Sequence, residues 1–224
     1  MKQVIVFDMD DTLFPEYEFV RSGFHAVDSY LSFEYKIVGF FTKAWQKFNV
    51  GSRGDIFDQV LNEIGYSGNT KGLVNELVKV YRSHSPGIRL FDDAKWALEY
   101  YSKLVPLALL SDGFLQTQQN KASALGIESY FQKMYFTDQW GRECWKPSHC
   151  AFLRVQEDFS VNGNSCVYIS DNPSKDFIAP NQLGWRSIFI KRELGEYKNV
   201  KTPNNGNPNT IIDSLYELED ILAL

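Results

Sequence analysis

The first residues in this chain that could do chemistry stand in the stretch VIVFDMDDTLFPE, Val4–Glu16. Four apolar residues precede Asp8, and Asp10, Asp11 and Thr12 follow within four positions. Like charges this close repel, and burying them at the end of an apolar strand costs free energy unless a cation compensates. The stretch therefore indicates carboxylates that act together with a cation. The alternative is an acidic turn that is solvated or caps a helix.

Three later segments carry polar residues in comparable places. Ser111 ends the apolar run in LLSDG, Lys146 stands in ECWKPSH, and Asp171 and Asp176 stand in YISDNPSKD. Each has a structural explanation when taken singly, since Ser111 could cap a turn, Lys146 could be a solvated cation and Asp171 could cap a helix. Because the carboxyl ends of parallel strands gather along one edge of a sheet, we expect these side chains to meet Asp8 at a single site.

Five apolar runs predict the strands that must position these residues. Most are apolar throughout, which is typical of strands covered on both faces of a parallel sheet. The runs are Gln3–Asp8, Val105–Ser111, Lys133–Asp138, Cys166–Ser170 and Arg186–Lys191. Helices are predicted between or after them at 91–104, 114–126, 146–159, 172–184 and 211–222, with a polar surface loop at 200–210. This alternation predicts an α/β fold with a doubly wound parallel sheet.

Prolines mark the predicted helix starts. Pro147 and Pro173 suit a first helical turn, and Asn172 is a candidate N-cap for the second of these helices. Pro180 lies inside the same helix and is predicted to end or kink it.

Residues 15–86 interrupt the alternation, because they contain helical periodicity but no good strand. We predict a core domain of residues 1–14 and 87–224 and a helical cap of residues 15–86. The cap follows the acidic turn directly, where ligands bind in such sheets, so its position favours a lid; the alternative is a set of additional core helices. Cap residues that could contact a polar or anionic substrate are Arg21, His25 and Arg53, together with Lys43 and Trp45.

Composition excludes several classes of protein. The chain has 224 residues, 44% hydrophobic and 23% charged, which is ordinary for a soluble globular protein. Its net charge of −5 argues against a nucleic-acid partner. The sequence shows neither a signal peptide nor an apolar run long enough to span a membrane, so we expect a cytoplasmic protein.

The cysteines are sparse, and sparse use fits a reducing compartment. Cys144, His149 and Cys150 lie close together, but no fourth ligand accompanies them. We therefore predict free thiols and a surface histidine rather than a zinc site.

Taken together, the four motifs resemble the haloacid dehalogenase superfamily, most of whose members are phosphohydrolases. The first motif of the family, D-x-D-x-T, is matched by Asp8, Asp10 and Thr12. The second, a Ser or Thr after a strand, is matched by Ser111, and the third, a Lys, by Lys146. The fourth, D-x-x-x-x-D, is matched by Asp171 and Asp176. One departure is Ser170, where the family often has Gly; we expect little effect, because only the backbone is constrained there. The resemblance implies a Rossmann-like core with the first strand in the middle of the sheet.

The chemistry of phosphoryl transfer agrees with the resemblance, since it needs an in-line nucleophile, a cation and a proton source. Asp8 can attack phosphorus and form an aspartyl-phosphate, while Asp10 protonates the leaving oxygen and then deprotonates the hydrolytic water. Mg²⁺ would be held by Asp8, the backbone carbonyl of Asp10 and Asp171, with Asp176 supporting that shell or ligating directly.

The remaining motif residues are assigned to the phosphate. Ser111 and the amide of Asp112 or Gly113 can donate to phosphate oxygens, and Lys146 binds them as a point charge while it balances the carboxylates. Thr12 is expected to orient the acidic turn.

We predict a Mg²⁺-dependent phosphatase for a small phosphorylated metabolite, such as a sugar phosphate or nucleotide monophosphate. A dehalogenase would attack carbon without Mg²⁺ and lack the second aspartate, and a phosphonatase would also depart from Asp10. A phosphomutase shares the whole set of residues and stays open. A non-enzymatic binding protein should tolerate the loss of its catalytic carboxylates, and none is missing here.

Overall fold

The structure is a computed structural model that describes residues 3–222. The chain divides into two compact units. One unit comprises the chain up to Glu16 together with the chain from Arg89 onward, and the second comprises Tyr17–Ile88. The predicted division placed the cap at 15–86. That the second unit acts as a lid stays a prediction.

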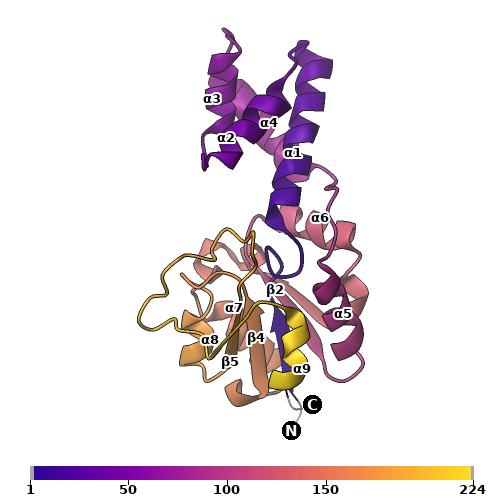
Figure 1. Cartoon of the computed structure of the whole chain (residues 1–224), viewed down its shortest axis with the longest axis vertical. Helices are drawn as coiled ribbons and strands as arrows, with labels where there is room; N and C mark the ends of the chain where they lie inside the picture. Colours follow the sequence, from indigo (N-terminus) through magenta and orange to yellow (C-terminus); the bar gives the residue numbers. More distant parts are fainter. Residues whose placement is uncertain (1–2, 223–224) are drawn as a thin grey trace. The chain divides into compact units, whose positions relative to one another are not determined.

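The first unit is built on a six-stranded sheet in the order β3-β2-β1-β4-β5-β6, and every neighbouring pair is parallel (Figure 1). The strands are β1 Val4–Phe7, β2 Leu107–Ser111, β3 Lys133–Phe136, β4 Cys166–Ser170, β5 Arg186–Ile190 and β6 Thr210–Ile212. The α/β fold with a parallel sheet is confirmed. β1 lies between β2 and β4, which is the central position that the resemblance implied.

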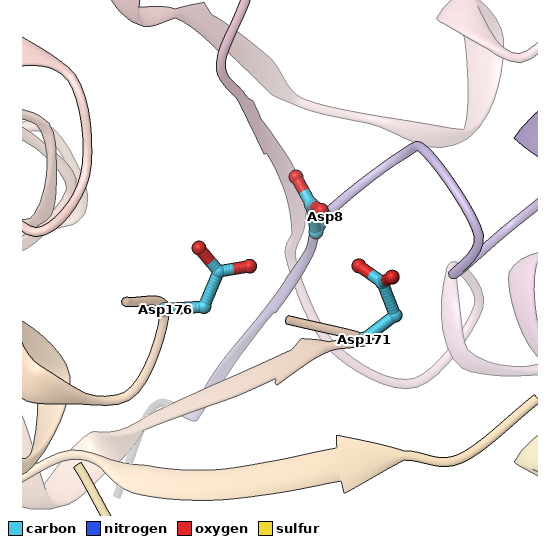
Figure 2. A group of neighbouring side chains, drawn as sticks. All are labelled: Asp8, Asp171 and Asp176. Carbon is cyan, nitrogen blue, oxygen red and sulfur yellow. The ribbon is translucent and has the colours of Figure 1, made fainter. Parts of the chain in front are cut away.

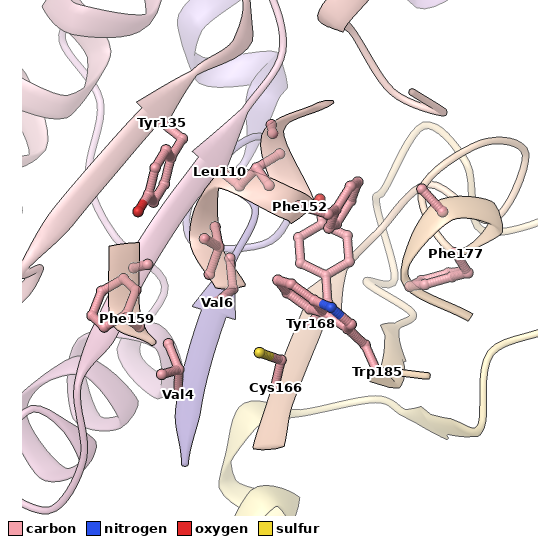
Figure 3. Close-up of a cluster of buried hydrophobic side chains, with 14 of the residues drawn as sticks. Val4, Val6, Leu110, Tyr135, Phe152, Phe159, Cys166, Tyr168, Phe177 and Trp185 are labelled. Atoms are coloured by element: carbon pink, nitrogen blue, oxygen red, sulfur yellow. The ribbon is translucent and has the colours of Figure 1, made fainter. Parts of the chain in front are cut away.

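Both faces of the sheet are covered at its centre, which explains why β1, β2 and β4 are almost entirely apolar. On one face, Val4 and Val6 of β1 lie beside Cys166 and Tyr168 of β4, and aromatic side chains such as Phe152 pack over them (Figure 3). On the other face, the alternating residues of the same strands, including Ile5, Phe7 and Ile169, are also fully buried.

Helices of the first unit connect the strands. They are α5 Asp92–Tyr101, α6 Leu115–Leu125, α7 Cys150–Phe159, α8 Ile178–Gln182 and α9 Leu218–Ile221. α6 ends at Gly126, whose left-handed φ of 64° is the backbone conformation that closes many helices.

The C-terminal prediction is wrong in part. Thr210–Ile212 form β6, which pairs in parallel with β5, whereas the sequence predicted a helix from residue 211 and only five strands. The terminal helical segment begins at Leu215, after a capping box in which the Ser214 hydroxyl and the Glu217 carboxylate each accept from the other's backbone. Thr210–Ile212 are β-branched and fit either a strand or the start of a helix. Their pairing with the open edge of β5 favours the strand.

Two predicted helices start later than expected. Lys146 does not begin a helix, because it lies in the turn before α7 and its peptide bond to Pro147 is cis. After Asn172, whose side chain accepts from the Ser174 backbone, the chain makes turns before the short α8. Pro180 lies in the first turn of α8, where its missing N–H costs little.

The predicted free thiols are also wrong for two of the cysteines. Cys144 and Cys150 form a disulfide, with their Cα atoms 5.2 Å apart. The intervening segment turns back on itself, and the Ser148 N–H donates to the Trp145 carbonyl at 2.9 Å. Cys166 remains a buried thiol, and burial raises its pKa to about 12.

The second unit is helical. It contains α1, which starts at the junction and spans Glu16–Tyr30, a π-helical turn at Leu31–Tyr35, α2 Phe40–Asn49, α3 Ile56–Glu63 and α4 Thr70–Ser83. Its core is rich in aromatic rings, among them Phe24, which meets Phe40 edge-on at 6.4 Å between ring centres. No helix in the described part of the whole chain has the length and apolar character needed to cross a membrane.

Candidate active site

The carboxyl edge of the central strands brings the sequence motifs together. Asp8 directly follows β1, and its backbone N–H donates to the Ile169 carbonyl of β4 at 2.9 Å. Ser111 is the last residue of β2, and Asp171 follows β4. Since β2, β1 and β4 are adjacent and parallel, these side chains emerge at one edge of the sheet, as predicted for the switch region of such folds.

Three carboxylates form the centre of this edge. Asp8, Asp171 and Asp176 each offer an oxygen, and these oxygens lie within 4.8 Å of one another. Figure 2 shows the three side chains converging on a common space from β1 and from the segment after β4. All three residues are buried, and within residues 3–222 the buried Asp176 Oδ1 has no hydrogen-bond partner.

The surroundings of Asp8 and Asp171 disfavour negative charge on these two carboxylates. Burial raises the pKa of Asp8 to about 7, with Asp176 and Asp10 adding to the shift and Lys146 opposing it. Burial and the neighbouring carboxylates Asp8 and Asp176 raise the pKa of Asp171 well above its ordinary value. Crowded carboxylate oxygens, one of them unpartnered, are the donors that a hard divalent cation such as Mg²⁺ prefers, so the residues present fit that ion.

Lys146 is the buried cation beside the trio. Its Nζ donates to Asp8 Oδ1 at 3.0 Å, to Asp176 Oδ2 at 3.2 Å and to the Tyr168 hydroxyl at 3.0 Å. Burial alone would lower the pKa of this ammonium, but the charges of Asp176 and Asp8 outweigh burial and raise it. Lys146 therefore stays charged next to Asp8.

Ser111, Asp112 and Gly113 form the turn after β2. The Asp112 carboxylate accepts from the Lys146 backbone N–H, from Thr137 Oγ1 at 2.8 Å and from Lys175 Nζ at 2.6 Å. Burial raises the pKa of Asp112, but Lys146 and Lys175 outweigh burial and lower it. The Asp112 side chain thus ties the Lys146 loop to this turn, a structural role that the sequence did not indicate.

Gly113 adopts a φ of 127°, and a Cβ added there would lie 2.4 Å from Gln118 Nε2. A side chain at this position would therefore strain the backbone and collide with α6. Glycine lets the turn pass close to the helix that follows it.

The acidic turn itself is held from several sides. Asp10 is partly exposed and pairs with Lys121, whose Nζ lies 2.7 Å from Asp10 Oδ1. Asp11 has a left-handed φ of 47°, and its carboxylate accepts from the backbone N–H groups of Glu16 and Glu196. Thr12 is fully buried and its carbonyl accepts from Arg192 at 2.7 Å. Its hydroxyl has no hydrogen-bond partner within the described chain, so Thr12 is fixed through its backbone.

Ser170 contributes more than the sequence analysis expected. Its hydroxyl donates to Asp176 and lies 3.3 Å from Asp8 Oδ2. A glycine at this position could not make these contacts, so the premise that only the backbone is constrained there is wrong, while the expected small effect on function stays a prediction. The side chain at this position orients two carboxylates of the trio.

A cavity of about 220 Å³ opens over the trio. Several residues that line it were not assigned to the site from the sequence; they are Glu16, Gln118, Trp145, Asn172, Lys175 and Tyr197. Burial, with the charges of Asp10 and Asp11 adding to it, raises the pKa of Glu16 to about 8. Gln118 and Lys121 share the spacing of one helical face directly after the Ser111 motif, and this spacing was the one available sequence signal.

The predicted substrate-binding residues of the cap all lie in the second unit. Arg21 is exposed, and the His25 ring stacks on Phe41 with 3.6 Å between ring centres. The Arg53 guanidinium lies 4.0 Å from the centre of the Phe48 ring and donates to the Phe48 carbonyl. A role in substrate binding stays a prediction for these three residues.

The two other polar cap residues also contact their own unit. Lys43 pairs with Glu63 at 3.7 Å. Trp45 stacks between Phe41 and Phe48. Both side chains therefore have structural partners within the second unit.

Comparisons with known proteins agree with this geometry. The family described as haloacid dehalogenase-like hydrolase matches residues 5–190. The glyceraldehyde 3-phosphate phosphatase of Methanopyrus kandleri is 24% identical over 99% of this chain and 97% of its own. The N-acylneuraminate-9-phosphatase of Mus musculus is 24% identical over 74% of this chain and 65% of its own.

Among solved structures, the hydrolase YfnB of Bacillus subtilis, bound to magnesium, superposes with a TM-score of 0.70. It is 18% identical, and the match covers 100% of this chain and 99% of that one. At this identity the likeness shows a common fold.

Proposed function

The chain belongs to the haloacid dehalogenase-like hydrolases, and from this premise we propose that it is a Mg²⁺-dependent phosphatase acting on a small phosphorylated metabolite. One observation carries the proposal: a buried aspartate, Asp8, directly follows β1, with Lys146 Nζ 3.0 Å from its Oδ1 and with oxygens of two further carboxylates within 4.8 Å. This arrangement offers a nucleophile together with sites for a phosphate and for a cation.

In the proposed reaction a carboxylate oxygen of Asp8 attacks phosphorus, and an Asp8–phosphorus bond forms while the bond to the leaving oxygen breaks. Asp10 donates a proton to that oxygen. Asp10 then takes a proton from water, which attacks the aspartyl-phosphate, releases inorganic phosphate and restores the Asp8 carboxylate.

The other side chains of the site bind and orient the phosphate. Lys146 offers its ammonium to the phosphoryl oxygens, and Ser111 offers its hydroxyl. Mg²⁺, held by Asp8, Asp171, the Asp10 backbone carbonyl and Asp176, would neutralise the carboxylates and the phosphoryl charge. Without such neutralisation, the trio would repel a phosphate dianion.

Two observations support a small substrate. The cavity over the trio measures about 220 Å³ and lies among charged and polar side chains, which suits a small phosphorylated sugar more than a large apolar molecule. Relatives that match nearly the whole chain are named glyceraldehyde 3-phosphate phosphatases. We therefore propose a phosphorylated sugar of this size as the substrate.

The first test measures phosphate release from p-nitrophenyl phosphate with Mg²⁺. Asp8→Asn should abolish turnover while circular dichroism shows an intact fold, and excess chelator should abolish the wild-type activity until Mg²⁺ is restored. The matched control is Asp213→Asn, which changes an exposed carboxylate and should leave activity unchanged. Turnover by Asp8→Asn, full activity in chelator, or halide release from a 2-haloacid in place of phosphate release would refute the proposal.

A screen of phosphorylated metabolites, ranked by kcat/KM, tests the substrate class. We expect phosphorylated sugars of the size of glyceraldehyde 3-phosphate to rank first. An isomerised sugar phosphate as product, with no free phosphate, would identify a mutase instead.

A further inference from the structure

α6 presents two buried polar side chains to Asp10. Lys121 Nζ donates to Asp10 Oδ1 at 2.7 Å, and Gln118 Nε2 donates to Asp10 Oδ2 at 3.4 Å. The two donors are three residues apart, so they share one face of the helix. Each carboxylate oxygen of Asp10 therefore has its own donor.

We propose that Lys121 and Gln118 are positioning residues that hold the carboxyl group of Asp10 in the orientation in which its protonated form gives a proton to the leaving oxygen and becomes the carboxylate. The proposal rests on the acid–base role assigned to Asp10 under Proposed function. Lys121 and Gln118 contact Asp10 and act through it.

The burial of the pair argues against an incidental surface contact. Lys121 is 2% exposed and Gln118 is 4% exposed, whereas exposed ion pairs are held loosely and contribute little. Burying an ammonium is unfavourable unless its partner is close and well oriented. Lys121 also lies 5.7 Å from the centre of the Phe14 ring, which limits its movement. A rigid donor is the kind of support that fixes the orientation of a reacting group.

Gln118 connects this support to the proposed phosphate site. Its Oε1 accepts from the Ser111 hydroxyl at 3.3 Å, while its Nε2 faces Asp10. The absence of a side chain at Gly113 leaves room for that amide. Gln118 therefore contacts both the Ser111 side chain and the proposed acid, which relates the positions of these two groups.

The competing explanation is that Lys121 only balances the charge of the acidic turn. Such a role would weaken binding or stability in its absence, but it would affect all phosphate esters alike. A positioning role predicts a dependence on the leaving group, because a poor leaving group needs a proton from Asp10 and a good one departs without it.

The experiment compares kcat/KM for phenyl phosphate and p-nitrophenyl phosphate, which differ little in size but strongly in leaving-group quality. kcat/KM reports the steps up to departure of the phenol, so the later hydrolysis of the aspartyl-phosphate does not enter. We expect Lys121→Met to lower kcat/KM for phenyl phosphate by about 100-fold, the usual scale of general acid catalysis, and that for p-nitrophenyl phosphate far less. Lys121→Arg keeps a cation at this position and should retain most of the kcat/KM for phenyl phosphate that Lys121→Met loses.

The controls separate this proposal from the one on which it rests. Lys133→Met makes the same substitution in an exposed Lys–Asp pair, at 3.1 Å to Asp158 and at the amino end of β3, and it should leave both rates unchanged. Asp10→Asn should show the same leaving-group dependence as Lys121→Met. Equal losses for both esters in Lys121→Met, or none, overturn the positioning role. Equal losses in Asp10→Asn instead overturn the acid role of Asp10.

Discussion

Asp8→Asn should stabilise the metal-free protein, because Asp8 is held where its charge is unfavourable. Burial raises the pKa of Asp8 from 3.8 to about 7, despite the nearby Lys146 ammonium. Between these two pH values the unfolded chain has lost the Asp8 proton and the folded chain has kept it. The free energy of unfolding therefore falls as pH rises through this window. Above the window, the ionised Asp8 destabilises the folded chain by the full amount.

The magnitude follows from the size of the shift. About three pKa units, at 1.36 kcal/mol each, correspond to about 4 kcal/mol, which is an upper bound because the site can relax and admit water. Asn has the shape of the protonated aspartic acid and cannot ionise. We expect Asp8→Asn to raise the free energy of unfolding by about 2 to 4 kcal/mol at pH 8, and to have little effect at pH 4.

The assay is urea unfolding followed by circular dichroism, in chelator, at pH 4, 6 and 8. Asp213→Asn, which removes an exposed carboxylate, serves as the control and should change nothing. Mg²⁺ should stabilise the wild type more than Asp8→Asn, because only the wild type keeps the full set of ligands. An Asp8→Asn protein no more stable than the wild type at pH 8 without metal would refute the reasoning.

Two further predictions concern stability. Arg192→Met removes donors at 2.6 Å from Asp93 and 2.7 Å from the Thr12 carbonyl, so urea unfolding should show a loss of about 3 kcal/mol from the uncompensated buried charge; a loss under about 1 kcal/mol would contradict this. Reducing the Cys144–Cys150 disulfide should cost about 2 kcal/mol, as expected for a small closed ring, and lower Tm. Cys144→Ser should have the lower Tm already, and reductant should not change it further; an equal Tm for the oxidised wild type and Cys144→Ser would contradict the stabilising role.

The strands of the central sheet could be predicted because their signal is local. Runs such as Cys166–Ser170 are apolar at all but the last position, and this pattern is typical of a strand covered on both faces. β6 could not be predicted in the same way. Its residues, Thr210–Ile212, also fit the start of an amphipathic helix, and their pairing with β5 depends on where the preceding loop places them.

The motif residues of the candidate site could also be predicted from the sequence, because their signal is local. Asp8 and Asp10 stand together after one apolar run, and Ser111 and Asp171 each mark the end of another. Residues that support the site through side-chain contacts could not be predicted from the sequence. Lys121 and Asp10 lie 111 residues apart in the sequence, and apart from the spacing that Lys121 shares with Gln118, nothing local distinguishes Lys121 from an exposed lysine on a helix.

The amino-acid sequence alone determined the fold class, the strands after which the motif residues stand and the identity of the carboxylates. Apolar runs and short motifs are properties of neighbouring residues, so the sequence is enough to identify them. Only the tertiary structure decided which distant side chains surround those carboxylates. Ser170 as a donor to Asp176, Asp112 as a tie to the Lys146 loop, and the disulfide beside that loop all depend on distances across the folded chain. Burial and charge at the site, which set the raised pKa of Asp8, likewise exist only once the sheet has formed.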